Sequence, residues 1–197
     1  MGSHTYGRMS DLPTIAAALA DLPEEGPLPV TQWHPARHGR MALTIRHDGT
    51  WIHEGGIIAR PRLVRLLSRI LRHDPDGYVL VSPAEKLAIT VEDVPFIITD
   101  MDLSGTACRM RTNVGDVVTL GPDHPIELRP DAPPGGGAAV PKETPMIPYV
   151  RIRDDLWARL GRNVYYRLME EAVEGEDGRY VLRLPGLDRP LDLGEAR

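Results

Sequence analysis

The chain has 197 residues, a formal net charge of −5, 42% hydrophobic residues and a single cysteine, Cys108. The acidic balance argues against general electrostatic binding of nucleic acid, and one cysteine excludes an intramolecular disulfide framework. No apolar run approaches the roughly 20 residues of a membrane-spanning helix. We therefore expect a cytoplasmic protein without a nucleic-acid partner, built as one large or two small domains, with two favoured.

The first 40 residues predict a short helix followed by an extended arm. Ser10 or Asp11 can cap a helix that ends at Pro23, since both side chains can accept a hydrogen bond from the first free backbone amides. Prolines punctuate the arm that follows, which favours extended backbone. We expect residues 1–40 to pack on the first half of the protein.

Residues 41–58 alternate between apolar and polar side chains, and the alternation breaks at Asp48-Gly49. This dipeptide is a strong hairpin signal because both residues tolerate the positive φ that tight turns require. The sequence therefore predicts two antiparallel strands. We also expect Trp33 and Trp51 to be mostly buried, as tryptophans usually are.

A helix is predicted over residues 61–73, where leucine, valine and isoleucine recur with helical spacing. Pro61 suits its first turn, because the amide that proline lacks would have no partner inside the helix. Short runs rich in β-branched residues then predict strands at 78–81 and 87–91. Pro95 marks a natural boundary.

Beyond this boundary the pattern predicts further strands between residues 96 and 120. Residues 131–148 are rich in proline and glycine and predict a long, flexible surface loop. A second helix is predicted over roughly 156–174, with a break at Gly161 and its firm part beginning near Arg162.

The two helical regions align without a gap at an offset of 102 residues. We therefore predict an α+β protein of two structurally related halves, each with the order hairpin, helix, strand, strand. The halves are a domain over 41–94 and a domain over 95–197. Chance similarity is the alternative, because strand-helix-strand units are common.

An ordered series of short motifs resembles a known family. The motifs are Trp33-His34-Pro35, Asp48-Gly49-Thr50-Trp51, Pro83-Ala84-Glu85-Lys86, Val91-Glu92-Asp93-Val94-Pro95-Phe96, Arg111-Thr112-Asn113, Asp123-His124-Pro125 and Val164-Tyr165-Tyr166. The chain is similar to the bacterial family called domain of unknown function 1285 over roughly residues 33–184. The resemblance implies a duplicated α+β architecture with a pleckstrin-homology-like C-terminal half. It also implies a nucleotide-like ligand at the interface of the halves and a role in signal transduction.

Candidate ligand-binding residues stand near predicted strand ends and within these motifs. They are Trp51, Arg60, Glu85, Lys86, Arg111, Thr112, Asn113 and His124. Arginine offers a two-pronged donor for phosphate and lysine a point charge, while threonine and asparagine can hydrogen-bond a sugar or base. The alternative is structural: an ion pair of Glu85 or Asp93 with Lys86 or Arg111, and Asn113 filling a turn.

Other chemistry is weaker in this sequence. Four histidines at positions 34, 38, 47 and 53 fit no established zinc spacing, so we predict no metal site and no cofactor. Cys108 is expected to be a buried, unreactive thiol. No nucleophile, base and orienting group can be assembled, so we favour a non-catalytic ligand-binding or regulatory protein over a small hydrolase or transferase using His124 or Glu85.

A basic stripe on the first predicted helix supports a third interpretation. Arg62, Arg65, Arg69 and Arg72 follow helical spacing, whereas the second helix carries Glu170, Glu171 and Glu174. Such stripes are usually solvated faces. Their opposite signs also suit a docking surface, so a protein-interaction adaptor using the 61–73 helix remains an alternative.

Overall fold

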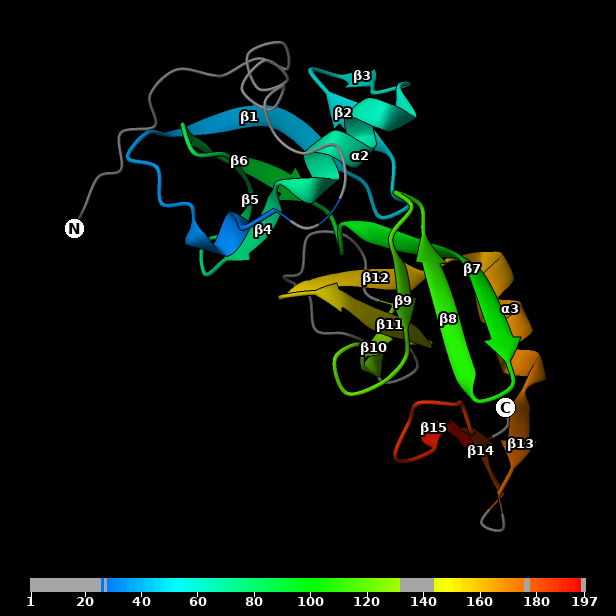
Figure 1. Cartoon of the computed structure of the whole chain (residues 1–197). Helices are drawn as coiled ribbons and strands as arrows, with labels where there is room; N and C mark the ends of the chain where they lie inside the picture. The colour runs from blue at the N-terminus through cyan, green and yellow to red at the C-terminus, as the bar shows by residue number, and fades with distance from the viewer. Residues whose placement is uncertain (1–25, 27, 132–143, 176–177, 196–197) are drawn as a thin grey trace. The chain divides into compact units, whose positions relative to one another are not determined.

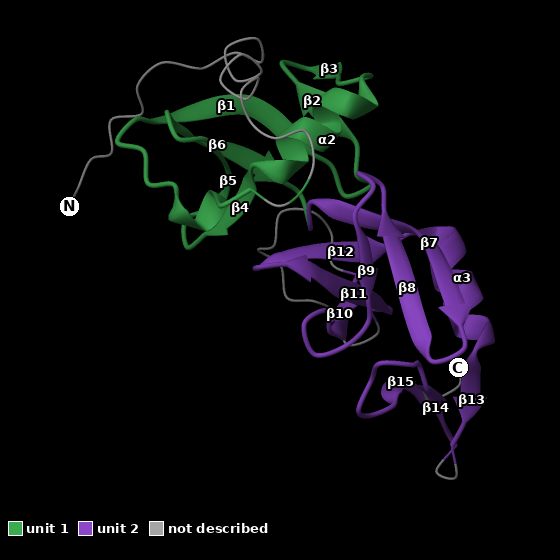
Figure 2. Cartoon of the chain, viewed as in Figure 1, with its two compact units in different colours: residues 1–93 green, residues 94–197 purple. Residues whose placement is uncertain are grey.

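The computed structural model describes residues 26, 28–131, 144–175 and 178–195. The chain divides into two compact units, residues 1–93 and 94–197, and each is dominated by β-sheet (Figure 2). The helix predicted before Pro23 and most of the predicted 131–148 loop lie outside the described residues. Among the described helices, none has both the length and the hydropathy needed to span a bilayer.

In its described residues, the first unit is a six-stranded sheet with one α-helix (Figure 1). Its elements are the 3₁₀-helix η1 (Val30–Gln32), β1 (His38–Ile45), β2 (Trp51–His53), β3 (Gly56–Ile57), α2 (Pro61–Arg69), β4 (Leu71–Asp74), β5 (Gly77–Val81) and β6 (Lys86–Val91). The strand order is β3-β2-β1-β6-β5-β4, in which β1 and β6 run parallel and every other neighbouring pair runs antiparallel.

The β1–β2 hairpin confirms the turn predicted at Asp48-Gly49. Gly49 has a φ of +80°, and the Asp48 carboxylate accepts a hydrogen bond of 2.9 Å from the backbone amide of Thr50. The turn pairs Ile45 with Trp51 across the two strands. Trp51 is 2% exposed, as predicted, because this pairing directs its side chain into the core.

Trp33 is largely but not fully buried, which agrees with the expectation that it is mostly buried. It caps η1 at the edge of the unit, and its carbonyl oxygen accepts a hydrogen bond from Arg72 on β4. The same guanidinium nitrogen donates to the carbonyl oxygen of Val30. The arm is therefore fixed mainly through its backbone and through the buried Val30 side chain.

The first helix is shorter than predicted. Pro61 occupies its first turn as expected, but α2 ends at Arg69 and residues 71–74 form β4. Ile70 leaves the helical region with φ −102° and ψ 8°. Leu71 then pairs with Leu80 of β5, and both leucines are buried. Strand pairing with β5 therefore overrides the local helical spacing, while β5 and β6 confirm the strands predicted at 78–81 and 87–91.

The described part of the second unit, residues 94–131, 144–175 and 178–195, contains a six-stranded sheet, a three-stranded sheet and one α-helix. Its elements are β7 (Phe96–Ser104), β8 (Ala107–Thr112), β9 (Val117–Thr119), β10 (Ile126–Pro130), β11 (Met146–Arg153), β12 (Leu156–Leu160), α3 (Arg162–Glu170), β13 (Ala172–Glu174), β14 (Arg179–Leu182) and β15 (Leu191–Glu195). The large sheet has the order β10-β11-β12-β7-β8-β9, and β13-β14-β15 form the small antiparallel sheet. Helix α3 packs against β7 (Figure 1).

Two expectations for this unit were wrong at element ends. The predicted loop over 131–148 overlaps β11, since Met146 and Ile147 already pair with β10. The helix predicted over 156–174 is strand β12 before Gly161 and strand β13 after Glu171, but the predicted break at Gly161 and the helix beginning near Arg162 are confirmed. Gly161 makes the change possible: a Cβ there would lie 2.7 Å from the Ile98 carbonyl oxygen, which accepts the Gly161 amide hydrogen bond at 2.9 Å.

The two six-stranded sheets share one topology. In chain order, each has a three-strand meander, a crossover and a second meander whose last strand runs parallel to the first strand of the unit. They differ in the place of the helix. Helix α2 lies in the crossover between β3 and β4, whereas α3 follows β12.

Candidate functional site

Lys86 lies at the start of β6, where Asp74 of β4 binds it. The Lys86 ammonium is 3.1 Å from Asp74 Oδ2, and the same carboxylate accepts two hydrogen bonds from Arg72, of 2.6 and 3.0 Å. The pKa of Asp74 is held below its usual value of 3.8 mainly by the hydrogen bond from Arg72 and, to a smaller extent, by that from Lys86, although partial burial acts in the opposite direction. Lys86 therefore forms an ion pair, as the structural alternative predicted, but with Asp74, which that alternative did not include.

Glu85 stabilises the turn between β5 and β6. It is buried, and its carboxylate lies 3.7 Å from Arg37 Nε. Its backbone amide donates to Ser82 Oγ at 3.2 Å, and its carbonyl oxygen accepts from the Ser82 amide at 2.9 Å. Glu85 therefore has an ion pair with Arg37, a partner that the sequence did not suggest.

Thr112 and Asn113 form the turn between β8 and β9. Thr112 Oγ1 accepts a hydrogen bond from the Asp116 amide at 3.0 Å, and the Asp116 carbonyl oxygen accepts from the Thr112 amide at 2.8 Å. Asn113 Oδ1 accepts from the Ile97 amide at 3.0 Å. Asn113 thus lies in a turn, as in the structural alternative, and Thr112 orders the same turn.

Arg111 precedes this turn and is exposed on β8. It is opposite Asp100 in the β7–β8 pair. The pKa of Asp100 is lowered first by a hydrogen bond from Arg167, and the positive charge of Arg111 adds to this effect. Arg111 therefore remains accessible to a ligand in a way that Lys86 does not.

The remaining candidates have different surroundings. His124 Nδ1 lies 3.1 Å from the Arg151 carbonyl oxygen and can donate to it in the tautomer protonated at Nδ1. Trp51 belongs to the core, and its buried Nε1 has no hydrogen-bond partner in the described structure. Arg60 is exposed at the start of α2. Trp51, Arg60, Glu85 and Lys86 thus belong to the first unit, and Arg111, Thr112, Asn113 and His124 to the second.

Only two of the four arginines predicted to form a basic stripe on the first helix are exposed on it. Arg62 and Arg65 are exposed on α2, whereas Arg69 donates a hydrogen bond of 2.9 Å to the Gly26 carbonyl oxygen. Arg72 lies on β4 and is engaged by Asp74. The helix ends before residue 72, which removes that arginine from the surface the sequence suggested.

The structure also locates the histidines and the cysteine. His38 Nε2 lies 3.0 Å from the Pro35 carbonyl oxygen, and His47 Nδ1 lies 3.2 Å from Glu92 Oε2. Within the described ranges, histidine, cysteine and acidic side chains form no group of three suited to a metal ion. Cys108 is fully buried, as expected, and burial followed by the charge of Asp102 raises its pKa to about 11.

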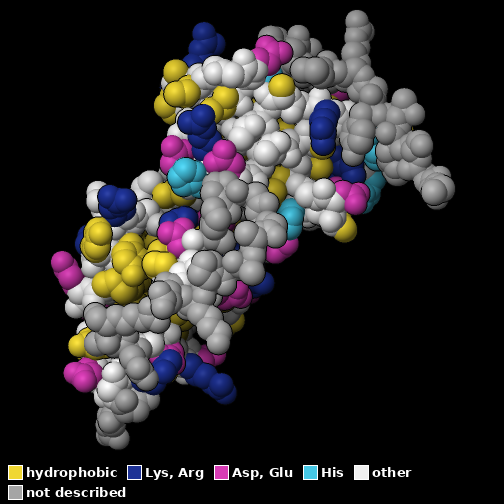
Figure 3. All heavy atoms as spheres, turned by 180° about the vertical axis from the view of Figure 1, so that it is seen from behind, with side chains coloured by type: hydrophobic (Ala, Val, Ile, Leu, Met, Phe, Trp, Pro, Cys, Tyr) yellow, Lys and Arg dark blue, Asp and Glu magenta, His cyan; other side chains and the backbone are white. Residues whose placement is uncertain are grey.

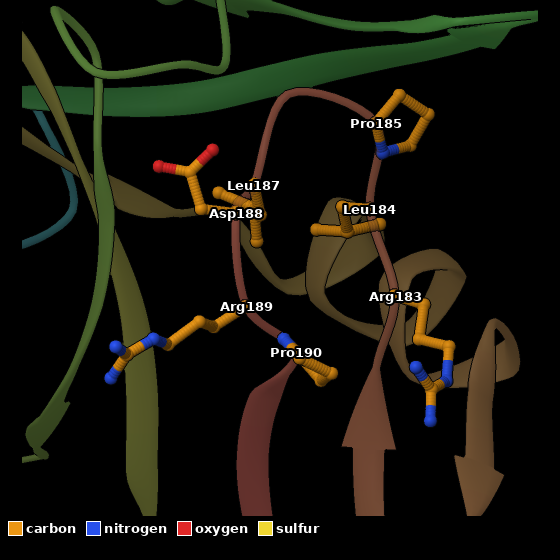
Figure 4. Close-up of a pocket in the computed structure, with 7 residues that line it drawn as sticks. All are labelled: Arg183, Leu184, Pro185, Leu187, Asp188, Arg189 and Pro190. Atoms are coloured by element: carbon orange, nitrogen blue, oxygen red, sulfur yellow. The ribbon is translucent and has the colours of Figure 1, made fainter.

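Sequence reasoning missed a hollow of about 330 Å³ in the loop between β14 and β15 (Figure 4). Seven consecutive or nearly consecutive residues line it: Arg183, Leu184, Pro185, Leu187, Asp188, Arg189 and Pro190. Figure 4 shows the two leucine side chains at its centre, with the two arginines extending on opposite sides. Neither guanidinium group has a hydrogen bond or ion pair with another described residue.

Gly186 fixes the course of this loop. Its φ is +90°, and a Cβ at this position would lie 2.1 Å from the carbonyl oxygen of Leu120. The Leu187 amide donates to the Leu184 carbonyl oxygen at 3.2 Å, which closes a tight turn around the glycine. The hollow is thus held against the end of the β8–β9 region. The Pro-Gly pair was a turn signal available in the sequence, but nothing local showed that two arginines would flank a cavity.

Comparison with known families confirms the resemblance carried by the motifs. The model described as "Domain of unknown function (DUF1285), N-terminal domain" matches residues 28–94, and "Protein of unknown function (DUF1285), C-terminal domain" matches residues 95–186. The chain belongs to the DUF1285 family. The two matched regions meet within one residue of the division between the two units.

Solved DUF1285 structures support the same assignment. A DUF1285 family protein from Silicibacter pomeroyi DSS-3 is 34% identical, with a TM-score of 0.78 over 96% of this chain and 97% of that one. A DUF1285 family protein from Shewanella baltica OS155 is 22% identical, with a TM-score of 0.50 over 66% of this chain and 91% of that one, a likeness of fold alone. The search of curated proteins found no significant match.

Proposed function

We propose that this DUF1285 protein is a non-catalytic binding protein with a regulatory role in signal transduction, and that its ligand is a small phosphorylated, nucleotide-like molecule. The hollow flanked by Arg183 and Arg189 carries the proposal. Its volume of about 330 Å³ lies at the lower end of the range of roughly 300 to 1,000 Å³ common for small-molecule sites.

The chemistry of the hollow suits such a ligand. Leu184 and Leu187 provide an apolar centre on which the flat face of a base can rest, and arginine can bind phosphate oxygens through two parallel hydrogen bonds. Both arginines lack a described partner, so a phosphate does not have to displace an existing ion pair. Asp188 lines the same hollow, and its carboxylate disfavours anions close to it.

Two features of the fold support the finer architectural inference. The second unit has six strands, β7 to β12, followed by α3, an order compatible with a pleckstrin-homology-like domain ending in a helix. The shared topology of the two large sheets supports an internal duplication that relates β1–β6 to β7–β12. This correspondence differs from the 102-residue offset, which relates α2 to α3 and the strands after them.

The competing enzymatic function has less support. His124 contacts the Arg151 carbonyl oxygen, and the buried Glu85 contacts Arg37 and the turn before β6. Both potential bases therefore have structural roles in their own units. The adaptor function is favoured by one observation, the exposure of Arg62 and Arg65 on α2.

A thermal-shift screen of nucleotides, inorganic pyrophosphate and phosphorylated metabolites tests the binding proposal. A ligand should raise the melting temperature in proportion to the logarithm of its concentration above its dissociation constant. The variant Arg183→Ala/Arg189→Ala should keep its own melting temperature and lose most of the shift, because each charged hydrogen bond contributes about 1.5 to 3 kcal/mol.

A matched control removes two other exposed arginines of the same unit, Arg109→Ala/Arg162→Ala. It should respond to the ligand as the wild type does. An equal loss in both double variants would show a non-specific charge effect, and the absence of any shift across the screen would refute the proposed ligand class.

A further inference from the structure

A basic surface lies where β3 leads into α2. Residues 55–73 contain five arginines and no acidic residue. Arg60, Arg62 and Arg65 are exposed, and no described hydrogen bond or ion pair engages their guanidinium groups. Ile57, at 68% exposure, is the most exposed large hydrophobic side chain in the described structure. We call Ile57, Arg60, Arg62 and Arg65 the basic surface.

An acidic surface lies where α3 leads into β13. Glu170, Glu171 and Glu174 are exposed, and their carboxylates also lack partners among the described residues. Tyr166 is 60% exposed and Val173 48% exposed beside them. Seen from behind, hydrophobic side chains gather on the side of the second unit where α3 lies, with acidic side chains next to them (Figure 3). We call these five residues the acidic surface.

The two surfaces complement each other in charge and in kind. Each combines three charges of one sign, without partners among the described residues, with at least one exposed apolar side chain, and exposed apolar surface rimmed by polar groups marks protein contact sites. The net charge of −5 disfavours an anionic membrane or nucleic acid as the partner of the basic surface, since both would be repelled by the rest of the chain. The chain itself carries a suitable partner for each surface.

We propose that the basic surface binds the acidic surface of a second copy of this chain. The contact is heterologous, because different patches meet, and it generates either a closed oligomer or a growing assembly according to the rotation between copies. This inference is independent of the proposed ligand, because it uses neither the hollow nor its arginines.

Sedimentation velocity of the full chain over a range of concentrations tests the proposal. The wild type should show a weight-average mass that rises with concentration at low ionic strength and falls towards the monomer in 0.5 M NaCl, roughly the conditions under which exposed charges are strongly screened. Arg62→Glu/Arg65→Glu should weaken association on the order of 100-fold or more, since like charges placed against each other cost several kcal/mol. Glu170→Arg/Glu171→Arg should do the same.

Mixing the two variants is the decisive experiment. Arg62→Glu/Arg65→Glu carries two acidic surfaces, and Glu170→Arg/Glu171→Arg carries two basic surfaces. Surfaces of opposite sign therefore meet only between the two variants, so an equimolar mixture should associate again. Circular dichroism and melting temperature check that both variants are folded, which is expected because the altered residues are exposed. A wild type that stays monomeric, unchanged association of either variant, or a mixture that fails to associate would overturn the proposal. So would binding of anionic vesicles or nucleic acid through Arg62 and Arg65 by a monomeric wild type.

Discussion

Lys86 and Arg111 are both cations near strand ends, but their surroundings separate their roles. The side chain of Lys86 is 26% exposed and is bound to Asp74, which is also bound to Arg72. Arg111 is exposed on β8. Sequence alone could not separate the two, because Asp74 is twelve residues away from Lys86 and is brought to it only by the β4–β5–β6 meander.

Replacing Lys86 with Ala should lower the free energy of unfolding by about 1 to 2 kcal/mol, because a hydrogen bond between charged groups is lost at a partly shielded site. Arg111→Ala should change it by less than about 0.5 kcal/mol. The midpoint of urea denaturation measures both. Equal effects of the two substitutions would contradict the assignment of Lys86 to a structural cluster.

Asp74 should contribute to the dependence of stability on pH. Its folded-state pKa lies below the usual 3.8, so the unfolded chain binds this proton more readily. The contribution is therefore present above the unfolded pKa and is lost as the pH falls through the lower, folded pKa. Asp74→Asn should be less stable than wild type at pH 7, and the gap should narrow below about pH 4. The exposed Asp76→Asn is the control, and a gap that stays constant down to pH 2.5 would exclude this role for Asp74.

Cys108 should react slowly with thiol reagents in the folded protein. A pKa near 11 instead of 9.0 lowers the thiolate fraction about 100-fold at pH 8, since 11 − 9.0 is two pH units, and full burial slows access further. Ellman's reagent should therefore modify the native protein far more slowly than the urea-unfolded protein. Similar rates in the two states would show that the β7–β8 region opens readily.

At the scale of elements, local pattern predicted the centres of strands and helices better than their ends. The Asp48-Gly49 hairpin and the strands at 78–81 and 87–91 were correct because turn residues and β-branched runs are short-range signals. Residue 71 fits a helical apolar face as well as an inward strand position, so only its pairing with Leu80 decides between them. The strand at 156–160 was missed although one of its partners, β11, ends at Arg153; its other partner, β7, lies some 60 residues earlier in the chain.

The β14–β15 loop offers a controlled test of close approach. Gly186 and Gly194 both have a φ of +90°, but only at Gly186 would a Cβ meet another atom, the Leu120 carbonyl oxygen at 2.1 Å. Each Gly→Ala change costs about 1 to 2 kcal/mol in backbone strain. Gly186→Ala should lower the melting temperature clearly more than Gly194→Ala, because it adds a steric clash. Equal melting temperatures would show that the loop does not rest on Leu120.

At the scale of the whole molecule, the motif series predicted family membership, and the two family models cover residues 28–186 of the chain. The division into two domains was also predicted, from the chain length and the alignment of the two helical regions. The candidate site followed less well. Glu85, Thr112 and Asn113 are engaged in turns, while Arg183 and Arg189 become neighbours of one hollow only through a turn that Gly186 and Leu120 fix.

The proposed function requires a phosphorylated ligand to occupy the hollow between β14 and β15. The most direct measurement is an NMR titration of the ¹⁵N-labelled full chain with the nucleotide or phosphorylated metabolite that gives the largest thermal shift. Binding in the hollow should give saturable shifts of the backbone amides of residues 183–189 and of the Arg183 and Arg189 side-chain Nε–H groups, and these shifts should be lost in Arg183→Ala/Arg189→Ala. Saturable shifts centred on Arg111 or on Lys86 instead, with the 183–189 amides unmoved, would contradict it.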